Sequence, residues 1–165
     1  MLTSDLDLVL ALNNDNLPAV SELDLAELAR LHALSEVALV AELDQVFAGF
    51  CLVLPPGIDY ASINYGWFSA HAPALGYTTF AYLDRIAVTS AARRHGVGRA
   101  LYAHLVEELA PSAPVLFCEV NVRPHNATSL AFHATIGFRE VGQQDTDGGR
   151  KRVSLLALDL PPGRR

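Results

Sequence analysis

Apolar and polar residues follow two different rhythms in the first third of the chain. Residues 6–12 read Leu-Asp-Leu-Val-Leu-Ala-Leu and precede the polar, turn-forming run 13–16, which predicts a first strand. Apolar residues at helical spacing then predict a helix over 25–33, and Pro18 is suited to the first turn of another helix before it. Two strand-like runs follow, joined by Asp44-Gln45 in a connection short enough for a β-hairpin. They are residues 36–43 and 46–54.

The segment 55–78 differs from its surroundings, because it combines three prolines, three glycines and several aromatic residues. A connection of this length in a small domain is usually functional or contains a short element. Its aromatic side chains either cap the core or form a wall over a substrate pocket, and the sequence leaves both interpretations open. The candidates for substrate contact are Tyr60, Tyr65, Trp67 and Phe68.

Strands and helices alternate in the second half of the chain. Gly137 is suited to end a helix, and Asp147-Gly148-Gly149 to form a hairpin turn before the last strand. This order predicts an α/β protein built around one sheet. The predicted strands are 79–88, 115–121, a run that starts at Phe138, and 151–160, and the predicted helices are 96–110 and 127–136.

Composition restricts the class of protein. With 165 residues, of which 51% are hydrophobic and 18% charged, the chain fits one well-packed domain over residues 1–160 with a disordered tail over 161–165. A net charge of −6 argues against general nucleic-acid binding. Cys51 and Cys118 are too few for a disulfide framework or a zinc site, and we expect no metal. No signal peptide and no membrane span are expected, so the prediction is a cytoplasmic protein.

One basic spot stands out in this acidic chain. The strand-like run 82–88 is followed by a short connector, the turn Arg93-Arg94-His95-Gly96-Val97-Gly98 and a helix. The start of a helix leaves backbone N–H groups without partners, and glycines there let a phosphate approach them. The loop lacks the patterns of a nucleoside-triphosphate P-loop and of the dinucleotide fingerprint. It therefore predicts an anion site that is not for nucleoside triphosphates or NAD.

The context of this loop carries a family resemblance. The run Tyr82–Val88, four residues and then Arg93–Tyr102 resembles the acetyl-CoA motif of the GNAT acetyltransferase superfamily. A second block resembles the Asn-x-x-Ala…Leu-Tyr-x-x-x-Gly-Phe pattern of the same superfamily. It consists of Asn121, Asn126, Ser129 and Phe132–Phe138. Residues 60–68 and 80–88 are also similar to an uncharacterised branch of predicted acetyltransferases.

The resemblance implies a fold and a cofactor. The fold is a single mixed β-sheet of about six or seven strands, mostly antiparallel and splayed at a central parallel pair, flanked by about four helices. The pyrophosphate of acetyl-CoA would lie on the amides of Arg94–Arg99, its pantetheine would pair with the backbone of Ile86–Val88, and Asn126 would contact it from the other side. The implied cofactor residues are Ile86, Ala87, Val88, Arg93, Arg94, His95, Gly96, Val97, Gly98, Arg99, Asn126, Ser129 and Phe132.

Two carboxylates are candidates for the base that such a reaction needs. Asp84 lies on the cofactor strand, and alternation predicts that it points to the face opposite Arg85, so that the two form no simple pair. Its alternative role is structural. Glu119 lies in an otherwise buried-looking strand, where a carboxylate is costly unless it is paired or faces a cleft. It either binds or deprotonates the amine, or forms an ion pair with an arginine such as Arg85 or Arg123.

His133 stands where the family pattern usually has Tyr, the supposed acid for the departing thiolate. A neutral imidazole can still donate one N–H, so His133 is a candidate acid, and a packed or half-exposed role is the alternative. Tyr102 and Tyr82 are weaker substitutes for that acid.

The resulting prediction is an N-acetyltransferase that moves the acetyl group of acetyl-CoA directly to an amine of a small molecule or peptide. The alternatives are a CoA-binding regulatory protein without turnover, and an acyltransferase with another acyl donor or a non-amine acceptor. A homodimer is possible, and no nucleic-acid or membrane partner is expected.

Overall fold

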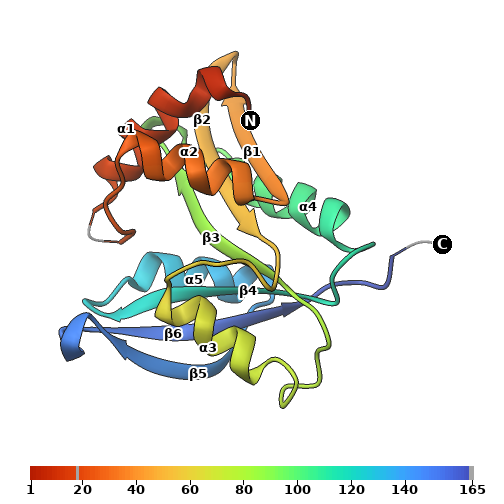
Figure 1. Cartoon of the computed structure of the whole chain (residues 1–165). Coiled ribbons are helices and arrows are strands. Elements are labelled where there is room, and N and C mark those ends of the chain that lie inside the picture. Colours follow the sequence, from red (N-terminus) through yellow and green to blue (C-terminus); the bar gives the residue numbers. More distant parts are fainter. Residues whose placement is uncertain (18, 164–165) are drawn as a thin grey trace. The chain divides into compact units, whose positions relative to one another are not determined.

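The computed structural model describes residues 1–17 and 19–163 (Figure 1). Contacts divide the chain into two compact units. Unit 1 comprises Met1–Pro55 and Leu83–Glu108, and unit 2 comprises Pro56–Tyr82 and Leu109–Arg165.

Three sequence predictions touch residues outside this description or are not tested by it. The helix start at Pro18 and the last two residues of the predicted disordered tail, Arg164 and Arg165, lie outside the described residues. The assignment of residues 1–160 to a single domain stays a prediction.

The described residues form five α-helices and six strands. The helices are α1 (Leu6–Asp15), α2 (Leu25–Leu34), α3 (Ile63–His71), α4 (Val97–Leu109) and α5 (Ala127–Ile136). The strands are β1 (Val37–Leu43), β2 (Val46–Leu54), β3 (Ala81–Val88), β4 (Val115–Arg123), β5 (Arg139–Thr146) and β6 (Lys151–Asp159).

The strands form a mixed sheet in the order β1-β2-β3-β4-β6-β5. β1 with β2, β4 with β6, and β5 with β6 pair antiparallel. β3 and β4 pair in parallel, through Ala81 opposite Leu116 and Tyr82 opposite Phe117. The predicted mixed sheet with a central parallel pair is confirmed.

In unit 1, residues 6–12 form a helix, and the prediction of a first strand there is wrong. α1 buries Leu6, Val9 and Leu12, three residues apart, while Leu8 is 52% exposed. A strand reading of the leucines would have placed Leu8 on the same face as Leu6. Leu and Ala are also strong helix formers, and the helix buries Val9 completely together with Leu6 and Leu12.

The helix predicted over 25–33 is confirmed as α2, which ends at Leu34, and the hairpin predicted after it is confirmed as well. The Asp24 side chain caps α2 by accepting from the Glu27 N–H at 2.8 Å. Asp44 and Gln45 connect β1 to β2 with φ of 53° and 64°. Positive φ at both central residues is typical of the tight turn that suits a two-residue hairpin.

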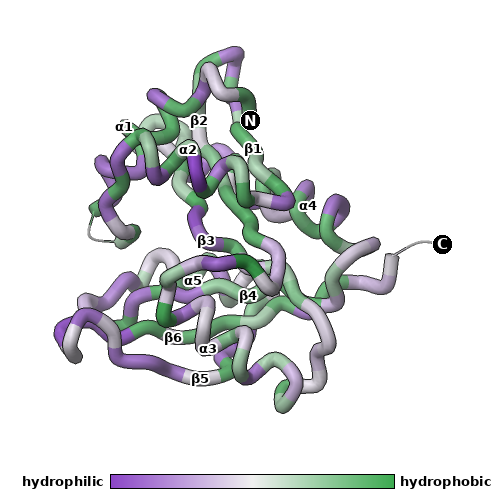
Figure 2. The backbone as a smooth tube through the Cα atoms, viewed as in Figure 1, coloured by the Kyte–Doolittle hydropathy of each residue, from purple (hydrophilic) through white to green (hydrophobic). Residues whose placement is uncertain are grey.

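In unit 2, the predicted long connection contains a helix. α3 begins after Ser62, whose hydroxyl accepts from the Tyr65 N–H at 3.3 Å. The chain then returns through β4, α5, β5 and β6, and Gly137 ends α5 with a φ of 110°, as predicted. Figure 2 shows β6 as mostly hydrophobic and β5 as mostly hydrophilic, which agrees with a buried β6 and a β5 at the edge of the sheet.

Candidate functional site

The loop between β3 and α4 in unit 1 turns sharply before the helix begins. Arg94 and Gly96 have φ of 65° and 83°, and α4 starts at Val97. The Ala100 N–H donates to the Gly96 carbonyl at 2.9 Å, so the helical ladder begins at Gly96. The N–H groups of the first helical turn have no partner within the helix, and the helix dipole adds partial positive charge there.

Gly96 is needed for its backbone conformation. A Cβ at this position would meet nothing within 4 Å, yet the left-handed φ costs an L-residue roughly 1–2 kcal/mol. Arg94 adopts the same conformation with a full side chain. Such a conformation in a residue other than glycine is uncommon and concentrates at functional sites.

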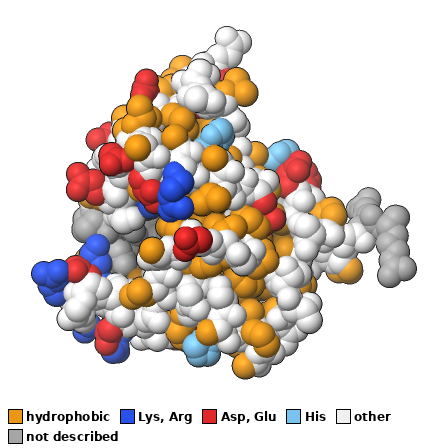
Figure 3. Space-filling view, in the orientation of Figure 1, with side chains coloured by type: hydrophobic (Ala, Val, Ile, Leu, Met, Phe, Trp, Pro, Cys, Tyr) orange, Lys and Arg blue, Asp and Glu red, His pale blue; other side chains and the backbone are white. Residues whose placement is uncertain are grey.

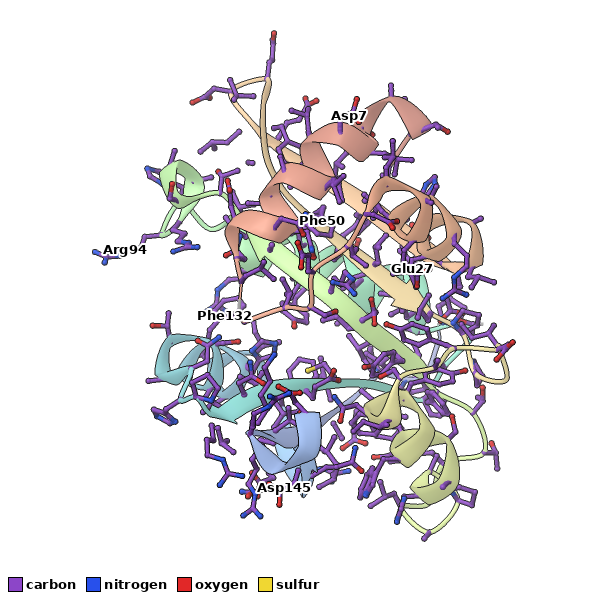
Figure 4. All side chains as sticks on the ribbon, turned by 60° about the vertical axis from the view of Figure 1, so that its left-hand side comes forward. Asp7, Glu27, Phe50, Arg94, Phe132 and Asp145 are labelled. Carbon is purple, nitrogen blue, oxygen red and sulfur yellow. The ribbon has the colours of Figure 1, made fainter. Side chains whose placement is uncertain are left out.

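The loop is also the basic spot predicted from the sequence. The Arg93 Nη2 donates to Asn16 Oδ1 at 3.0 Å, which ties the loop to the end of α1. Arg94, His95 and Arg99 are exposed, and Figure 4 shows the Arg94 side chain reaching away from the ribbon. Acidic and basic side chains are mixed on the face drawn in Figure 3. Arg94, His95 and Arg99 thus place three exposed basic side chains in one short segment of a protein whose net charge is −6.

The last residues of β3 lie close to β2. The Thr89 N–H donates to the Ala48 carbonyl at 2.9 Å. A Cβ at Gly49 would stand 2.7 Å from the Ala87 carbonyl oxygen and 3.3 Å from the Val88 Cα. Only glycine allows this approach, so Gly49 lets β2 lie close to Ala87 and Val88, two residues of the predicted pantetheine strand. Nothing in the local sequence around Gly49 indicates this role.

Asp84 and Arg85 form an ion pair, which corrects the prediction that they point apart. Arg85 Nε lies 2.9 Å from Asp84 Oδ2, and both side chains are buried. Alternation fixes the direction of the Cα–Cβ bond, but the long arginine side chain can still bend back to its neighbour. Arg85 also donates to Asn13 Oδ1, the Ser21 carbonyl and Ser21 Oγ, each at 2.9 Å. The pair therefore binds β3 to the connection that leaves α1.

Glu119 on β4 lies among neutral hydrogen-bond donors in unit 2. The Tyr82 hydroxyl donates to Glu119 Oε1 at 3.0 Å and to Oε2 at 2.8 Å. The Asn64 Nδ2 donates to Oε1 at 3.0 Å, and Asn64 Oδ1 accepts from Gln144 Nε2 at 2.9 Å. Hydrogen bonds to the charged form favour an ionised carboxylate. Glu119 is half-buried, while the residues of β4 before it are buried.

Sequence reasoning found Glu119 but missed most of this network. The sequence offers Tyr82 only as a substitute acid, and it does not indicate Asn64 or Gln144. Asn64 lies 55 residues before Glu119 in the sequence, and Gln144 lies 80 residues after Asn64. Nothing local in the sequence marks either of them.

His133 is packed, the alternative that the sequence left open. It is 4% exposed and lies edge-on to Phe138 with ring centroids 5.2 Å apart. Its Nδ1 donates to the Ser129 carbonyl at 2.7 Å, which places the single proton of the neutral ring on that nitrogen. Burial lowers the pKa of His133, partly opposed by this backbone hydrogen bond.

The remaining predicted cofactor residues of unit 2 lie at the start of α5. Asn126 Oδ1 accepts from the Ser129 N–H at 3.1 Å, so Asn126 caps the helix. Phe132 is half-buried beside the His133 ring, at a centroid distance of 5.8 Å. The helix cap gives Asn126 a structural role whether or not it contacts a cofactor.

Two of the four aromatic candidates belong to the core of unit 2. Tyr65 and Phe68 are 4% and 0% exposed. Tyr60 lies edge-on to Tyr65, with ring centroids 5.7 Å apart, and Trp67 stacks on His71 at 4.0 Å. A surface hollow of about 440 Å³ borders Tyr65. It is lined by Pro56, Gly57, Ile58, Tyr65, Ser69, Ala72, Pro73, Tyr77, Thr78, Thr79 and Phe80.

The described residues contain neither a membrane-spanning helix nor a cluster of metal ligands. No helix in this part of the chain is long and apolar enough to cross a membrane. Within residues 1–17 and 19–163, no three His, Cys, Asp or Glu side chains are grouped to hold a metal ion.

Comparison with known proteins decides the family. A sequence model of the "Acetyltransferase (GNAT) family" matches residues 7–138, which is most of the chain. The chain belongs to the GNAT acetyltransferase family. The resemblance of the two sequence blocks is thereby confirmed.

Curated relatives of this GNAT chain include "[Ribosomal protein bS18]-alanine N-acetyltransferase" of Escherichia coli K12 and of Shigella flexneri. Each is 34% identical over 84 residues, which cover 48% of this chain and 56% of the relative. The match thus spans about half the length of these relatives.

Solved structures share the GNAT fold over nearly the whole chain. The ribosomal-protein-S18-alanine N-acetyltransferase from Escherichia coli has a TM-score of 0.70 at 21% identity, covering 100% of this chain and 92% of that one. Ard1 from Thermoplasma volcanium has a TM-score of 0.74 at 17% identity, covering 98% and 95%. The putative acetyltransferase yncA from Salmonella typhimurium, solved with its cofactor acetyl-CoA, has a TM-score of 0.69 at 18% identity, covering 100% and 94%. At these identities the similarity establishes the fold.

Proposed function

We propose that the chain transfers the acetyl group of acetyl-CoA directly to an amine. The observation that carries this proposal is the β3–α4 loop, with left-handed Arg94 and Gly96 before the first turn of α4. Membership of the GNAT acetyltransferase family supports it.

The residues of the loop fit the pyrophosphate of acetyl-CoA. Gly96 presents no side chain over the helix start, and the first-turn N–H groups and the exposed Arg94 and Arg99 supply donors and positive charge. A dipole contribution of ~0.3–1 kcal/mol per charge is modest, so the hydrogen bonds and the arginines carry most of the attraction. Acetyl-CoA then supplies the acetyl thioester.

Glu119 is the proposed base. An amine with the unperturbed pKa of ~10.4 for lysine is neutral in only about one molecule in 2,500 at pH 7. Reaching the neutral form therefore costs about 4.6 kcal/mol. As the C–N bond forms, the nitrogen loses a proton, and the ionised Glu119 can accept it directly or through water. Asp84 is the weaker candidate, because Arg85 already neutralises it inside the core of unit 1.

His133 is not needed as an acid in this scheme. Its one proton is directed to the Ser129 carbonyl, and burial lowers its pKa. A thiol of ordinary pKa, ~8.5, leaves readily as a thiolate, so the C–S bond can break without a dedicated proton donor.

The relatives suggest a polypeptide N-terminus as the acceptor. Relatives at 34% identity are named as alanine N-acetyltransferases of ribosomal protein bS18. An α-amino group has a pKa of ~7.7–8.0, so about one in ten is neutral at pH 7, and the base has less to do than with a lysine. We place this activity in the cytoplasm, which the two buried free cysteines support.

Calorimetric titration with acetyl-CoA, CoA and ATP tests the loop. We expect micromolar binding of acetyl-CoA and CoA and none of ATP. Gly96→Glu should abolish binding, whereas the matched Gly148→Glu, also at an open glycine of positive φ, should leave it unchanged. Unchanged binding in Gly96→Glu would overturn the assignment of the loop.

Thiol release with three acceptors tests the reaction. They are a peptide with a free N-terminal alanine, the same peptide with a blocked N-terminus and one lysine, and a small diamine. Release with the free alanine alone supports an α-amino acceptor, and release with the diamine or lysine supports a broader amine acceptor. Binding of acetyl-CoA without release in any of them contradicts the transferase proposal.

A further inference from the structure

Three elements of unit 2 contribute one residue each to a chain of hydrogen bonds that ends at Glu119. Gln144 on β5 donates to Asn64 on α3 at 2.9 Å, and Asn64 donates to Glu119 on β4 at 3.0 Å. Tyr82 donates to the same carboxylate. Glu119 is therefore held from the helix above the sheet as well as from the neighbouring strand.

The order of donors and acceptors fixes the orientation of the Asn64 amide. An ionised carboxylate only accepts hydrogen bonds, so the Nδ2 of Asn64 must face Glu119. That orientation leaves Oδ1 for Gln144, which meets it with an N–H. A side chain at position 144 that only accepts hydrogen bonds would favour the flipped Asn64 amide. In that orientation the Asn64 oxygen would face Glu119.

The sheet and helix geometry bring the three residues together. Glu119 and Gly142 both lie opposite Leu155 of β6, so they share one face of the sheet. A Cβ at Gly142 would stand 2.9 Å from the Trp67 Cζ2, so only glycine lets α3 lie this close to β5. Asn64 is three residues before Trp67 and thus on the same side of α3, within reach of both strands.

We propose that Asn64 and Gln144 are positioning residues for Glu119: the Asn64 amide donates to the carboxylate, and the N–H of Gln144 holds that amide in place by donating to its oxygen. The role of Glu119 as base rests on the proposed function, but the hydrogen-bond relay is a property of the fold and can be measured without turnover.

Other groups near Glu119 do not obscure such a measurement. Tyr82 from β3 and Tyr65 from α3 carry phenol hydroxyls and no carboxyl group. Cys118 precedes Glu119 on β4, and burial raises its pKa well above the usual value. Leu155 of β6 and Gly142 of β5 carry no charge. The carboxyl signal that disappears in Glu119→Gln identifies the titration of Glu119.

The test is Gln144→Glu, which keeps the shape of the side chain and replaces a donor with an acceptor. We expect the pKa of Glu119, followed by carboxyl ¹³C NMR and assigned with Glu119→Gln, to rise by about one pH unit, because a donor is lost and a like charge is added. The acidic limb of the plot of kcat/KM against pH should shift to higher pH by the same amount. The control is Gln143→Glu, the same change at an exposed neighbour that contacts Glu140, which should move neither.

Asn64→Ala provides a second variant, should Gln144→Glu fold poorly. It removes the donor without adding charge, so the pKa of Glu119 should rise by a smaller amount, with acetyl-CoA affinity unchanged. An unmoved Glu119 titration in both variants would overturn the inference. A wild-type protein that binds acetyl-CoA but never releases thiol would overturn the proposed function instead, and the NMR titration would still decide the relay.

Discussion

Asp84 and Glu119 are both candidate bases from the sequence, but the structure places them in opposite surroundings. Asp84 in unit 1 is buried against the Arg85 guanidinium, which is itself bound to Asn13 and Ser21. Glu119 in unit 2 is half-buried and faces the neutral donors Tyr82 and Asn64. Both carboxylates lie on strands. Asp84 forms an ion pair with a buried guanidinium, whereas Glu119 accepts hydrogen bonds from an uncharged hydroxyl and an uncharged amide.

These surroundings decide which of the two carboxylates can exchange a proton. An ion pair in the core cannot take a proton without leaving its arginine uncompensated, which is costly in low dielectric. A carboxylate bound by neutral donors can gain or lose a proton with less disturbance. We therefore expect changes at Glu119 to affect turnover and changes around Asp84 to affect folding, and each prediction below tests that separation.

The largest effect is expected for Glu119→Gln on turnover. Removing a general base typically lowers the rate by ~10²–10⁴-fold. We expect kcat to fall in that range with acetyl-CoA affinity and Tm nearly unchanged, measured by thiol release, calorimetry and thermal denaturation. Glu140→Gln, at an exposed carboxylate on β5, is the control and should keep full activity. Full activity in Glu119→Gln would remove the distinction between the two carboxylates.

Asp84→Asn should mainly destabilise the fold. Breaking one side of a buried ion pair costs ~3–5 kcal/mol, because the remaining charge is left uncompensated. We expect the free energy of unfolding in urea to fall by about that amount. Adding Arg85→Met should cost less than the sum of the two single changes, since it removes the stranded charge. A stable Asp84→Asn protein without activity would reverse the assignment.

Asn13→Ala tests the outer support of the same pair. The substitution takes one acceptor from Arg85 and leaves a buried donor unsatisfied, which costs ~1–3 kcal/mol. The unfolding free energy should fall by that amount while thiol release per folded molecule is kept. Asp15→Ala, at an exposed residue near the end of α1, should change neither quantity. A loss of turnover alone would contradict a purely structural role.

The smallest effect concerns His133 and appears as a dependence of stability on pH. Burial holds its folded pKa below the unfolded value of ~6.5, so the unfolded state binds the proton first. Stability is therefore full above about pH 6.5 and falls as the pH drops toward the folded pKa. His133→Phe should lose less stability between pH 7 and pH 5 than the wild type, by about 1.4 kcal/mol per pH unit of separation between the two pKa values, as measured by urea denaturation.

The control for His133 is His125→Gln, at an exposed histidine just before α5. It should leave the pH dependence of stability as in the wild type. An unaltered pH dependence in His133→Phe would show that the buried imidazole does not carry the acid sensitivity.

Sequence reasoning predicted the parts of this protein that depend on neighbouring residues. The β3–loop–α4 unit lies within consecutive residues, so its glycines and helix start could be recognised. Residues 6–12 were misassigned because a short leucine-rich run fits a strand and a helix equally well, and only burial of Val9 with exposure of Leu8 decides. Tertiary packing, which a local pattern does not contain, decides that these residues form a helix.

The candidate site was predicted in part for the same reason. Glu119 was found because a carboxylate in an apolar strand is costly wherever it lies. Its partners Asn64 and Gln144 come from other elements, and no local rule assigns a partner across such distances. The Asp84–Arg85 pair was missed because alternation describes where a side chain starts and not where its charged end arrives.

The two cysteines give the protein a built-in reporter of opening. Cys51 lies in unit 1 and Cys118 in unit 2, both buried, and burial raises the pKa of Cys51 to about 12 and that of Cys118 well above its usual value. Neither thiol should react with an aromatic disulfide reagent while its unit is closed. Assays that detect released CoA with such a reagent should thus have a low protein background. Pulsed alkylation read by peptide mass would time the local unfolding of each unit separately, without an added label.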